Sequence, residues 1–340
     1  MLKVGMIGFG AIAKLHKAAY DALSNNGKNI RLVAVCDTSL EQFTHSTALN
    51  ISSTTVSTHN FNKYSVLDEM LEKEDPDIID ICVPTPVHCR LACEMLGKSK
   101  NVLCEKPMAR TYEECQLMLD AKNKSGKQLM IGQCVRFMPH YRYLKTAVCE
   151  KTFGEIKSAF FYRLSSPPVW GFKNWLLQPE KSGGCLLDMH IHDLDFSRFL
   201  FGEPDQISCS SSGFYADYDL VHSRLVYSRG SSDLSLTVEA TGDWSLSPSF
   251  PFSSGYRVNA EKATIVCEGT KVTVYPIQGE AFSPELDNSE VFYSEIDYFR
   301  SIITSGAENT INPPESAALS VRLAESLRAS ADAGGTLLKY

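Results

Sequence analysis

The fold is decided at the start of the chain, where residues 2–13 read LKVGMIGFGAIA. The apolar run 2–7 predicts a buried strand, and the spacing of apolar residues over 11–24 predicts a helix. Between them, Gly8 permits a tight turn, and Gly10 lets the backbone approach a pyrophosphate at the positive end of the helix. The segment therefore predicts a dinucleotide phosphate loop with contacts from Gly8, Phe9, Gly10, Ala11, Ile12 and Ala13.

An acidic residue closes the next predicted strand. Asp37 follows the apolar run 30–36 and comes 24 residues after Ala13. A carboxylate at this place accepts hydrogen bonds from the ribose hydroxyls and repels a 2′-phosphate. We therefore expect NAD as the cofactor, with NADP less favoured. The alternative is a helix-capping aspartate in an α/β domain that binds no cofactor.

Strand and helix patterns alternate in the first part of the chain. Alternation of this kind, with strands that are apolar along their whole length, is typical of a doubly wound parallel sheet. The predicted strands are 2–7, 30–36, 78–83, 102–104 and 128–131, and the predicted helices are 11–24, 39–48, 64–73, 88–98 and 111–124.

The pattern changes after about residue 135. Polar and apolar residues alternate between turn signals, which predicts a mostly antiparallel sheet with one covered face, and so an α+β domain. Strands are expected over 156–164, 206–214, 219–228, 233–241, 256–260, 263–267 and 271–275, and helices over 139–150, 185–200, 289–304 and 314–333. We expect a cofactor domain over 1–122 and a substrate and oligomerisation domain over 123–340, with the last helix able to pack back on the first domain.

Composition restricts the class of protein. Of 340 residues, 44% are hydrophobic and 21% are charged, which excludes disordered, collagen-like and coiled-coil chains. The net charge is −7, and no cluster of lysine and arginine supplies a nucleic-acid-binding face. The sequence has no apolar stretch long enough to span a membrane and no signal peptide, so we expect a soluble cytoplasmic protein. The eleven cysteines form no C-x-x-C pair and are expected to be free, mostly buried thiols rather than metal ligands.

Three further segments carry a resemblance to a known family. They are PTPVH at 84–88, EKP at 105–107 and GGCLLDMHIHD at 183–193. Together with the phosphate loop, their order and spacing resemble the glucose–fructose oxidoreductase, inositol dehydrogenase and rhizopine catabolism (Gfo/Idh/MocA) family over essentially the whole chain. The resemblance implies a Rossmann domain and a C-terminal domain with a large open sheet, often buried in a homodimer or homotetramer. It also implies reversible hydride transfer between a nicotinamide and a hydroxyl-bearing carbon of a sugar, polyol or inositol-like compound.

The resemblance also assigns roles to particular residues. Lys106 falls on the lysine of the family's E-K-P, whose Lys–Pro bond is often cis, and Asp188 and His192 fall on its D-x-x-x-H pair. Arg136 matches an arginine near the nicotinamide and the substrate. Further cofactor contacts are expected from Pro84, Thr85, His88, Glu105 and Lys106, although His88 is also placed to cap a helix.

The chemistry of these residues fits alcohol oxidation. His192 titrates near neutral pH and is our first choice as general acid and base. Lys106 assists, either as a base whose pKa is lowered from about 10.4 or as an ammonium that polarises the substrate oxygen. Asp188, four residues before His192, shares its face on a helix and can orient it, and Asp195 extends that face. Each of these residues also has a purely structural interpretation. Glu105 and Lys106 could form a solvated charge pair, Asp188 could cap a helix, and His192 could be a core histidine.

His190 and two tryptophans are the remaining candidates for contact with the substrate. His190 stands where a glycine is common in the family, and we expect it to face the substrate or a loop. A metal site built from 188, 190 and 192 would need an irregular backbone, because residue 190 points away from 188 on a helix. Trp170 and Trp175 lie in a loop ahead of the Asp188 segment, where they either stack on a sugar or simply pack.

The sequence leaves two alternatives to a dehydrogenase. One is an NAD-dependent glycosidase of the same fold, and the other is a sugar-sensing regulator without catalysis. Retention of Lys106, Asp188 and His192 argues against the regulator, but the residues do not separate dehydrogenase from glycosidase. They also do not name the substrate or the direction of the reaction.

Overall fold

The computed structural model describes residues 1–43, 60–228 and 235–340. They form two compact units, which are described separately below. Unit 1 contains Met1–Phe137 and Ser289–Ala318, and unit 2 contains Met138–Asn288 and Leu319–Tyr340. This division differs from the expected boundary after residue 122, which lies inside a helix, because the strand after that helix and the segment from 289 also belong to unit 1.

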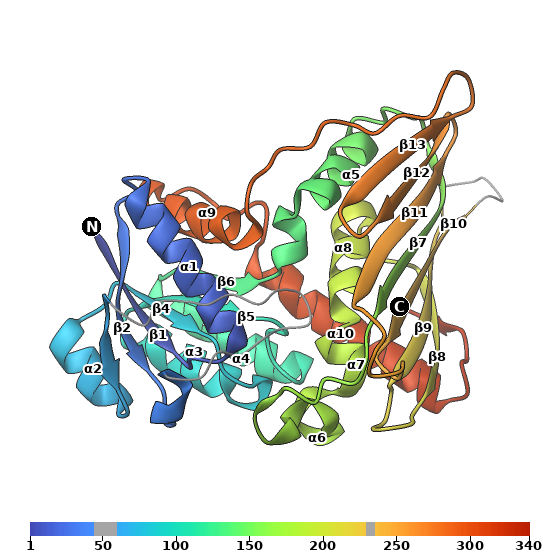
Figure 1. The fold of residues 1–340 in the computed structure, drawn as a ribbon. Helices are drawn as coiled ribbons and strands as arrows, with labels where there is room; N and C mark the ends of the chain where they lie inside the picture. The colour runs from blue at the N-terminus through green and yellow to red at the C-terminus, as the bar shows by residue number, and fades with distance from the viewer. Residues whose placement is uncertain (44–59, 229–234) are drawn as a thin grey trace. The chain divides into compact units, whose positions relative to one another are not determined.

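Unit 1 is built on a six-stranded parallel sheet in the order β3-β2-β1-β4-β5-β6 (Figure 1). Its strands are β1 (Leu2–Ile7), β2 (Ile30–Cys36), β3 (Asn62–Tyr64), β4 (Ile78–Ile81), β5 (Asn101–Glu105) and β6 (Leu129–Gly132). The order reverses between β1 and β4, so the loops that follow these two strands lie side by side at the switch point. The expected doubly wound sheet is confirmed.

Helices cover both faces of this sheet. α1 (Ala11–Asn25) packs on α9 (Val291–Ser305), and their apolar side chains share one core with β1 and β2. The other helices are α2 (Leu67–Glu74), α3 (His88–Gly97) and α4 (Tyr112–Ser125). β3 escaped prediction because its three residues, Asn62–Tyr64, are polar or half-exposed. Of the helix expected over 39–48, a 3₁₀ turn at Leu40–Phe43 is seen, and 44–48 lies outside the described residues.

Unit 2 is built on an eight-stranded sheet in the order β13-β12-β11-β7-β10-β9-β8-β14. In the described residues β7 and β10 pair in parallel and the other neighbours are antiparallel, as expected for a mostly antiparallel sheet. The strands are β7 (Ile156–Leu164), β8 (Gln206–Ser212), β9 (Leu220–Tyr227), β10 (Leu236–Asp243), β11 (Ser253–Ala260), β12 (Ala263–Glu268), β13 (Lys271–Pro276) and β14 (Leu338–Lys339).

One face of this sheet is covered by helices. Along β9, Val221, Ser223 and Leu225 are buried, whereas His222 and Arg224 are exposed on the opposite face. The helices are α5 (Pro139–Cys149), α6 (Pro179–Ser182), α7 (Gly184–Asp188), α8 (Ile191–Phe201) and the part of α10 (Pro314–Asp332) that follows Ala318. None of the helices in the described part of the chain has the length and apolar composition to cross a lipid bilayer.

The single helix expected over 185–200 is wrong. The chain forms α7 and α8 instead, with Met189 and His190 in the turn between them. The N–H groups of both turn residues donate to the carbonyl of Cys185, over 3.0 and 2.8 Å, which ends α7. The carbonyl of His190 then accepts from the N–H of Leu194 and begins α8.

Candidate functional site

The phosphate loop in unit 1 has the geometry that its sequence predicts. Gly8 has a φ of 89°, and a Cβ atom there would lie 2.4 Å from the carbonyl oxygen of Cys82. A Cβ at Gly10, by contrast, would meet nothing within 4 Å among the described residues, and Gly10, as the N-cap of α1, has no side chain to cap the helix. The loop therefore has open space at the start of a helix, where the helix dipole favours an anionic ligand, and these features fit a dinucleotide.

Asp37 contacts the phosphate loop directly. Its Oδ2 accepts the N–H of Phe9 over 2.7 Å, and its Oδ1 accepts the N–H of Ser39 over 2.7 Å. The Phe9 ring is fully buried and stacks on Phe43 with centroids 5.3 Å apart. Phe9 thus shapes the loop from inside. Ala13 is also fully buried, as close packing of the helix requires.

Lys14 is a charged residue at this loop that sequence reasoning missed. Its side chain is largely buried, and its ammonium lies 5.7 Å from the centroid of the Phe9 ring. Burial lowers the pKa of Lys14, and the nearby Asp37 carboxylate opposes that shift. A lysine in the first turn of a helix is unfavourable for the helix dipole, which was the one signal in the sequence.

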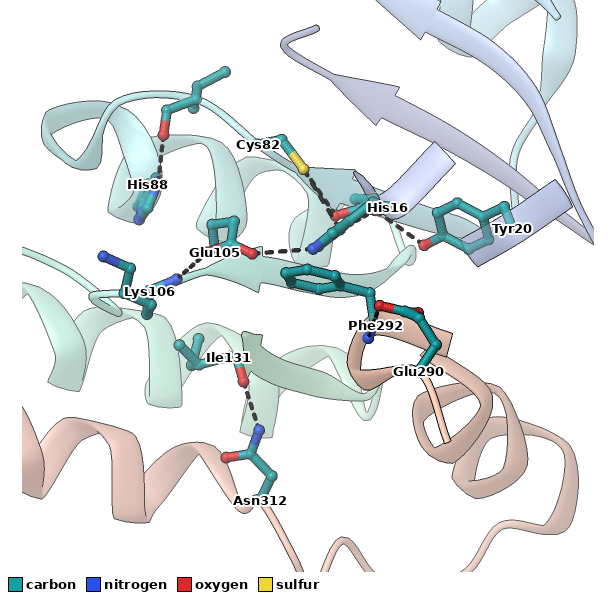
Figure 2. A network of polar contacts seen from close by, with 12 residues as sticks. His16, Tyr20, Cys82, His88, Glu105, Lys106, Ile131, Glu290, Phe292 and Asn312 are labelled. Carbon is teal, nitrogen blue, oxygen red and sulfur yellow. Dashed lines mark hydrogen bonds and ion pairs between the residues drawn. The ribbon is translucent and has the colours of Figure 1, made fainter. Parts of the chain in front are cut away.

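Lys106 follows directly on β5 and is partly exposed. The Lys106–Pro107 peptide bond is cis, as the resemblance implied. Glu105 is buried, and its Oε2 accepts the backbone N–H of Lys106 over 3.1 Å (Figure 2). The predicted cofactor residue Glu105 therefore turns its carboxylate into unit 1, where it contacts the neighbouring loop and α1.

His88 links this lysine loop to the loop after β4. Its Nδ1 lies 2.9 Å from the carbonyl oxygen of Pro107, and its Nε2 lies 2.8 Å from that of Val83. The ring is buried, and burial lowers its pKa. His88 thus holds the two loops together. Of the other residues predicted there, Thr85 is buried in a 3₁₀ turn and Pro84 is half-buried.

In unit 2, Asp188 and His192 occupy a distinctive position. Asp188 ends α7 and His192 is the second residue of α8, so the broken helix separates two residues that were expected on one continuous helix. All residues from 182 to 198 are described, and Asp188 and His192 are the only two of them that are not buried. A carboxylate and an imidazole are thus presented together from an otherwise buried segment.

The structure corrects the expectation for His190. Its side chain is fully buried rather than facing a loop, and its Nε2 lies 2.8 Å from Oγ of Ser223 on β9. Gly242 on β10 makes the room, because a Cβ there would lie 2.9 Å from the Cβ of His190. Burial lowers the pKa of His190 to about 3, so the ring is neutral. His190 is a core residue that anchors the turn between α7 and α8.

Arg136 is held by contacts within unit 1. The side chain is buried, and its guanidinium donates to the carbonyl of Ile311 and to Oγ of Ser316, each over 2.8 Å. It thereby ties the end of the parallel sheet to the segment that enters α10. Asp195, expected behind His192, accepts from Oγ of Ser320 on α10 over 2.8 Å. Both residues carry structural contacts that sequence spacing does not reveal.

The tryptophans differ in exposure. Trp175 is half-buried in a 3₁₀ segment (Phe172–Leu177), and Trp170 is 41% exposed. The cysteine prediction is confirmed for bonding: all eleven lie in the described ranges and are free. Seven are buried, and Cys149 is exposed.

Comparison with known proteins accounts for both halves of the chain. Residues 2–133 match a family model described as an oxidoreductase family with an NAD-binding Rossmann fold. Residues 141–266 match the model of the GFO/IDH/MocA C-terminal domain. The two matches together cover more than half of the sequence.

Individual relatives agree with the family models. The chain is 26% identical over 325 residues to inositol 2-dehydrogenase of Rhizobium meliloti, covering 90% of each protein. It is 33% identical over 219 residues to D-glucoside 3-dehydrogenase of Escherichia coli, covering 63% of this chain and 58% of that one. The fold matches the crystal structure of aldose-aldose oxidoreductase from Caulobacter crescentus complexed with glycerol, with a TM-score of 0.83 and 21% identity over 100% of this chain and 99% of that one.

The matches extend across the phosphate loop, the EKP segment and the segment that carries Asp188 and His192. Because one family explains both units, the chain belongs to the Gfo/Idh/MocA family of oxidoreductases, with an NAD-binding Rossmann fold.

Proposed function

We propose that this protein is an NAD-dependent dehydrogenase that oxidises a secondary alcohol of a sugar, a polyol or an inositol-like compound. The observation that carries the proposal is the exposure pattern of residues 182–198, where Asp188 and His192 are the only side chains that are not buried. A buried segment has no structural need to leave an acid and an imidazole partly exposed. A reaction that moves a proton does need them.

NAD is the cofactor that the phosphate loop favours. When bound, NAD supplies the hydride acceptor for alcohol oxidation. Gly10 and the first turn of α1 would hold the pyrophosphate, since the loop is open there. Asp37 would bind the ribose hydroxyls, and its charge would disfavour the 2′-phosphate of NADP.

His192 is the general acid and base in this proposal. Its imidazole takes the proton of the substrate hydroxyl during oxidation and returns it during reduction. Asp188 orients the imidazole or the substrate hydroxyl. Lys106 contributes a cation that stabilises negative charge on the substrate oxygen. Trp175 is a candidate surface for the apolar side of a sugar ring.

The substrate class follows from the names of relatives and from these roles. Inositol 2-dehydrogenase and D-glucoside 3-dehydrogenase are named for ring-bearing polyhydroxy substrates. We therefore propose a cyclic polyol or a glycoside as the substrate. The glycosidase alternative is an outcome of the test below.

The exposed face of the unit 2 sheet supports a homo-oligomer. On that face Phe160 and Tyr162 stack with centroids 6.1 Å apart, and the Arg257 guanidinium lies 5.8 Å from the Phe160 ring. We propose that two copies of the chain pair through this face. Phe160→Glu should convert the dimer to a monomer in light scattering, and an unchanged mass would contradict this surface.

Free thiols bear on the compartment. Eleven free cysteines, with Cys149 exposed, suit the reducing conditions of the cytoplasm, where we propose that the protein acts.

The test of the enzymatic proposal is NADH absorbance with purified protein, NAD and a panel of inositols, sugars and glycosides. Lys106→Ala should lower turnover by roughly 10²-fold or more while NADH still binds. Lys124→Ala, which removes an exposed lysine of α4, is the matched control and should have no effect. If the protein cleaves a glycoside without net NADH formation, it is an NAD-dependent glycosidase and the dehydrogenase proposal is wrong.

A further inference from the structure

A buried cluster of ionisable side chains lies next to the Lys106 loop in unit 1 (Figure 2). At its centre is His16 on α1, which is fully buried. Its Nδ1 lies 2.9 Å from Oδ2 of Asp80 on β4, and its Nε2 lies 3.0 Å from Oε1 of Glu105 at the end of β5. One imidazole thus bridges two carboxylates from neighbouring strands.

Asp80 and Cys82 together determine the charge of this histidine. Besides His16, the Asp80 carboxylate accepts from the hydroxyl of Tyr20 over 3.0 Å and from the thiol of Cys82 over 3.4 Å. Burial lowers the pKa of His16, but the charges of Asp80 and Cys82 and the hydrogen bonds to both groups together outweigh burial, and the pKa lies well above its usual value. His16 is therefore an imidazolium. A buried cation of this kind is stable only while it is paired.

Glu105 connects the imidazolium to the proposed catalytic lysine. One carboxylate oxygen faces His16, and the other accepts the backbone N–H of Lys106 over 3.1 Å. The carboxylate occupies space left open by Gly132, its register partner on β6, since a Cβ there would lie 2.9 Å from Oε1. Oε1 of Glu105 thus lies at ion-pair distance from His16, and Oε2 holds the first peptide of the lysine loop.

Glu295 on α9 adds a second reason for the pairing. This side chain is fully buried, and burial together with the charge of Glu105 raises its pKa well above the usual value, so it is neutral. The cluster therefore does not tolerate a second carboxylate charge beside that of Glu105. Without the imidazolium, a charged Glu105 would be unpaired in the same low-dielectric space, where an unpaired carboxylate is strongly disfavoured.

We propose that His16 is a positioning residue for the reaction: its imidazolium holds the Glu105 carboxylate on the backbone N–H of Lys106 and so fixes the lysine loop. The inference rests on the proposed role of Lys106. His16 performs this role without touching cofactor or substrate. The role differs from simple packing because the effect of His16 on the lysine loop must pass through Glu105.

The first test compares His16→Gln with Tyr20→Phe. Both variants remove a contact to Asp80, but only His16→Gln interrupts the connection to Glu105. For His16→Gln we expect kcat to fall about tenfold or more, because small displacements of a catalytic group are costly. NADH affinity should stay within about twofold. Amide hydrogen exchange at Lys106 should become faster. Tyr20→Phe should lower stability without either effect.

The second test uses Glu105→Gln, which keeps an oxygen for the Lys106 N–H but no longer needs a buried cation. In this background His16→Gln should change kcat by less than about twofold, because contacting residues are not additive. Because the double variant removes both charges, it also remains measurable if His16→Gln alone does not fold. Equal losses in the two backgrounds, or a Tyr20→Phe loss as large as that of His16→Gln, would reduce His16 to packing.

Two further outcomes distinguish the positioning role of His16 from the proposed dehydrogenase activity and from a metal site. If the wild-type protein oxidises no compound of the panel, the proposed dehydrogenase fails, whereas hydrogen exchange at Lys106 still decides whether His16 positions the loop. If the purified protein carries one zinc ion per chain that is lost in Cys82→Ala, the cluster of His16, Asp80 and Cys82 is a metal site and the positioning proposal is overturned.

Discussion

Oε1 of Glu105 lies 2.9 Å from the point that a Cβ atom at Gly132 would occupy. The two residues are partners in the register of β5 and β6, so their backbones cannot separate without breaking the sheet. Any side chain at position 132 must therefore displace the carboxylate. That displacement moves Glu105 relative to both His16 and the Lys106 N–H.

Gly132→Ala should consequently impair catalysis from a position outside the proposed reacting groups. We expect kcat to fall about tenfold and exchange of the Lys106 amide to become faster, because the carboxylate loses its place. The control is Gly97→Ala at the end of α3, where a Cβ meets nothing within 4 Å. Unchanged kinetics in Gly132→Ala would show that the carboxylate can shift without consequence.

The two glycines of the phosphate loop should respond in opposite ways. Gly8→Ala should lower the free energy of unfolding by about 2 kcal/mol or more, because φ is positive and a backbone oxygen occupies the space. Gly10→Ala should leave stability within about 0.5 kcal/mol. It should nevertheless weaken NADH binding about tenfold, a change of about 1.4 kcal/mol. Thermal unfolding and NADH fluorescence titration measure these effects, and tight NADH binding by Gly10→Ala would contradict the site.

The charge of Asp37 should set the preference for NAD. Asp37→Asn keeps an oxygen for the Phe9 N–H but removes the charge, so the ratio of kcat/KM for NAD over NADP should fall about tenfold. Asp37→Ala removes the acceptor as well and should also weaken NAD. A ratio that is the same in the Asn variant and in the wild type would exclude charge repulsion as the cause.

Two neighbouring histidines should separate activity from stability. His192→Asn should lower kcat by about 10²-fold with little change in unfolding, since the residue is partly exposed and proposed as the proton carrier. His190→Asn should instead lower the unfolding free energy by about 1–3 kcal/mol, because it leaves Ser223 and a packed site unsatisfied. If His190→Asn loses activity but keeps normal stability, His190 acts in the substrate site and its structural role is contradicted.

His190 also predicts an acid-sensitive unit 2. Burial lowers its pKa from 6.5 to about 3. Between these two pH values His190 is protonated in the unfolded chain but neutral in the folded chain. The stability it contributes is complete above pH 6.5 and falls as the pH drops toward about 3. At pH 5 the loss should be about 2 kcal/mol.

Tryptophan fluorescence measures this effect, because all three tryptophans, Trp170, Trp175 and Trp244, belong to unit 2. Urea unfolding at pH 7 and pH 5 should show a smaller acid loss in His190→Gln than in the wild type. Lys157→Gln, at an exposed position of β7, should behave like the wild type. Equal acid losses in wild type and His190→Gln would show that other groups control this dependence.

Much of unit 1 could be predicted because its signals are local. β1, the tight turn at Gly8 and the start of α1 depend on residues within a few positions of one another, and their predicted bounds agree closely with the structure. The acid after β2 could be found for the same reason, since the length of a βαβ unit sets its distance from the loop. The motif around Lys106 was recognised by its order in the chain.

Contacts between distant segments decided the rest. His16 meets Asp80 across 64 residues of sequence, and no periodicity of α1 indicates that its buried face carries an imidazolium. His190 is buried because Gly242 on β10 leaves space for it. The Arg136 guanidinium is hydrogen-bonded because Ile311 before α10 and Ser316 in its first turn supply the acceptors. The sequence by itself determined which elements form and where an anion can bind, because those properties depend on neighbours along the chain. Only the tertiary structure decided which polar side chains are buried and which partners they find, because burial and pairing depend on segments that folding brings together.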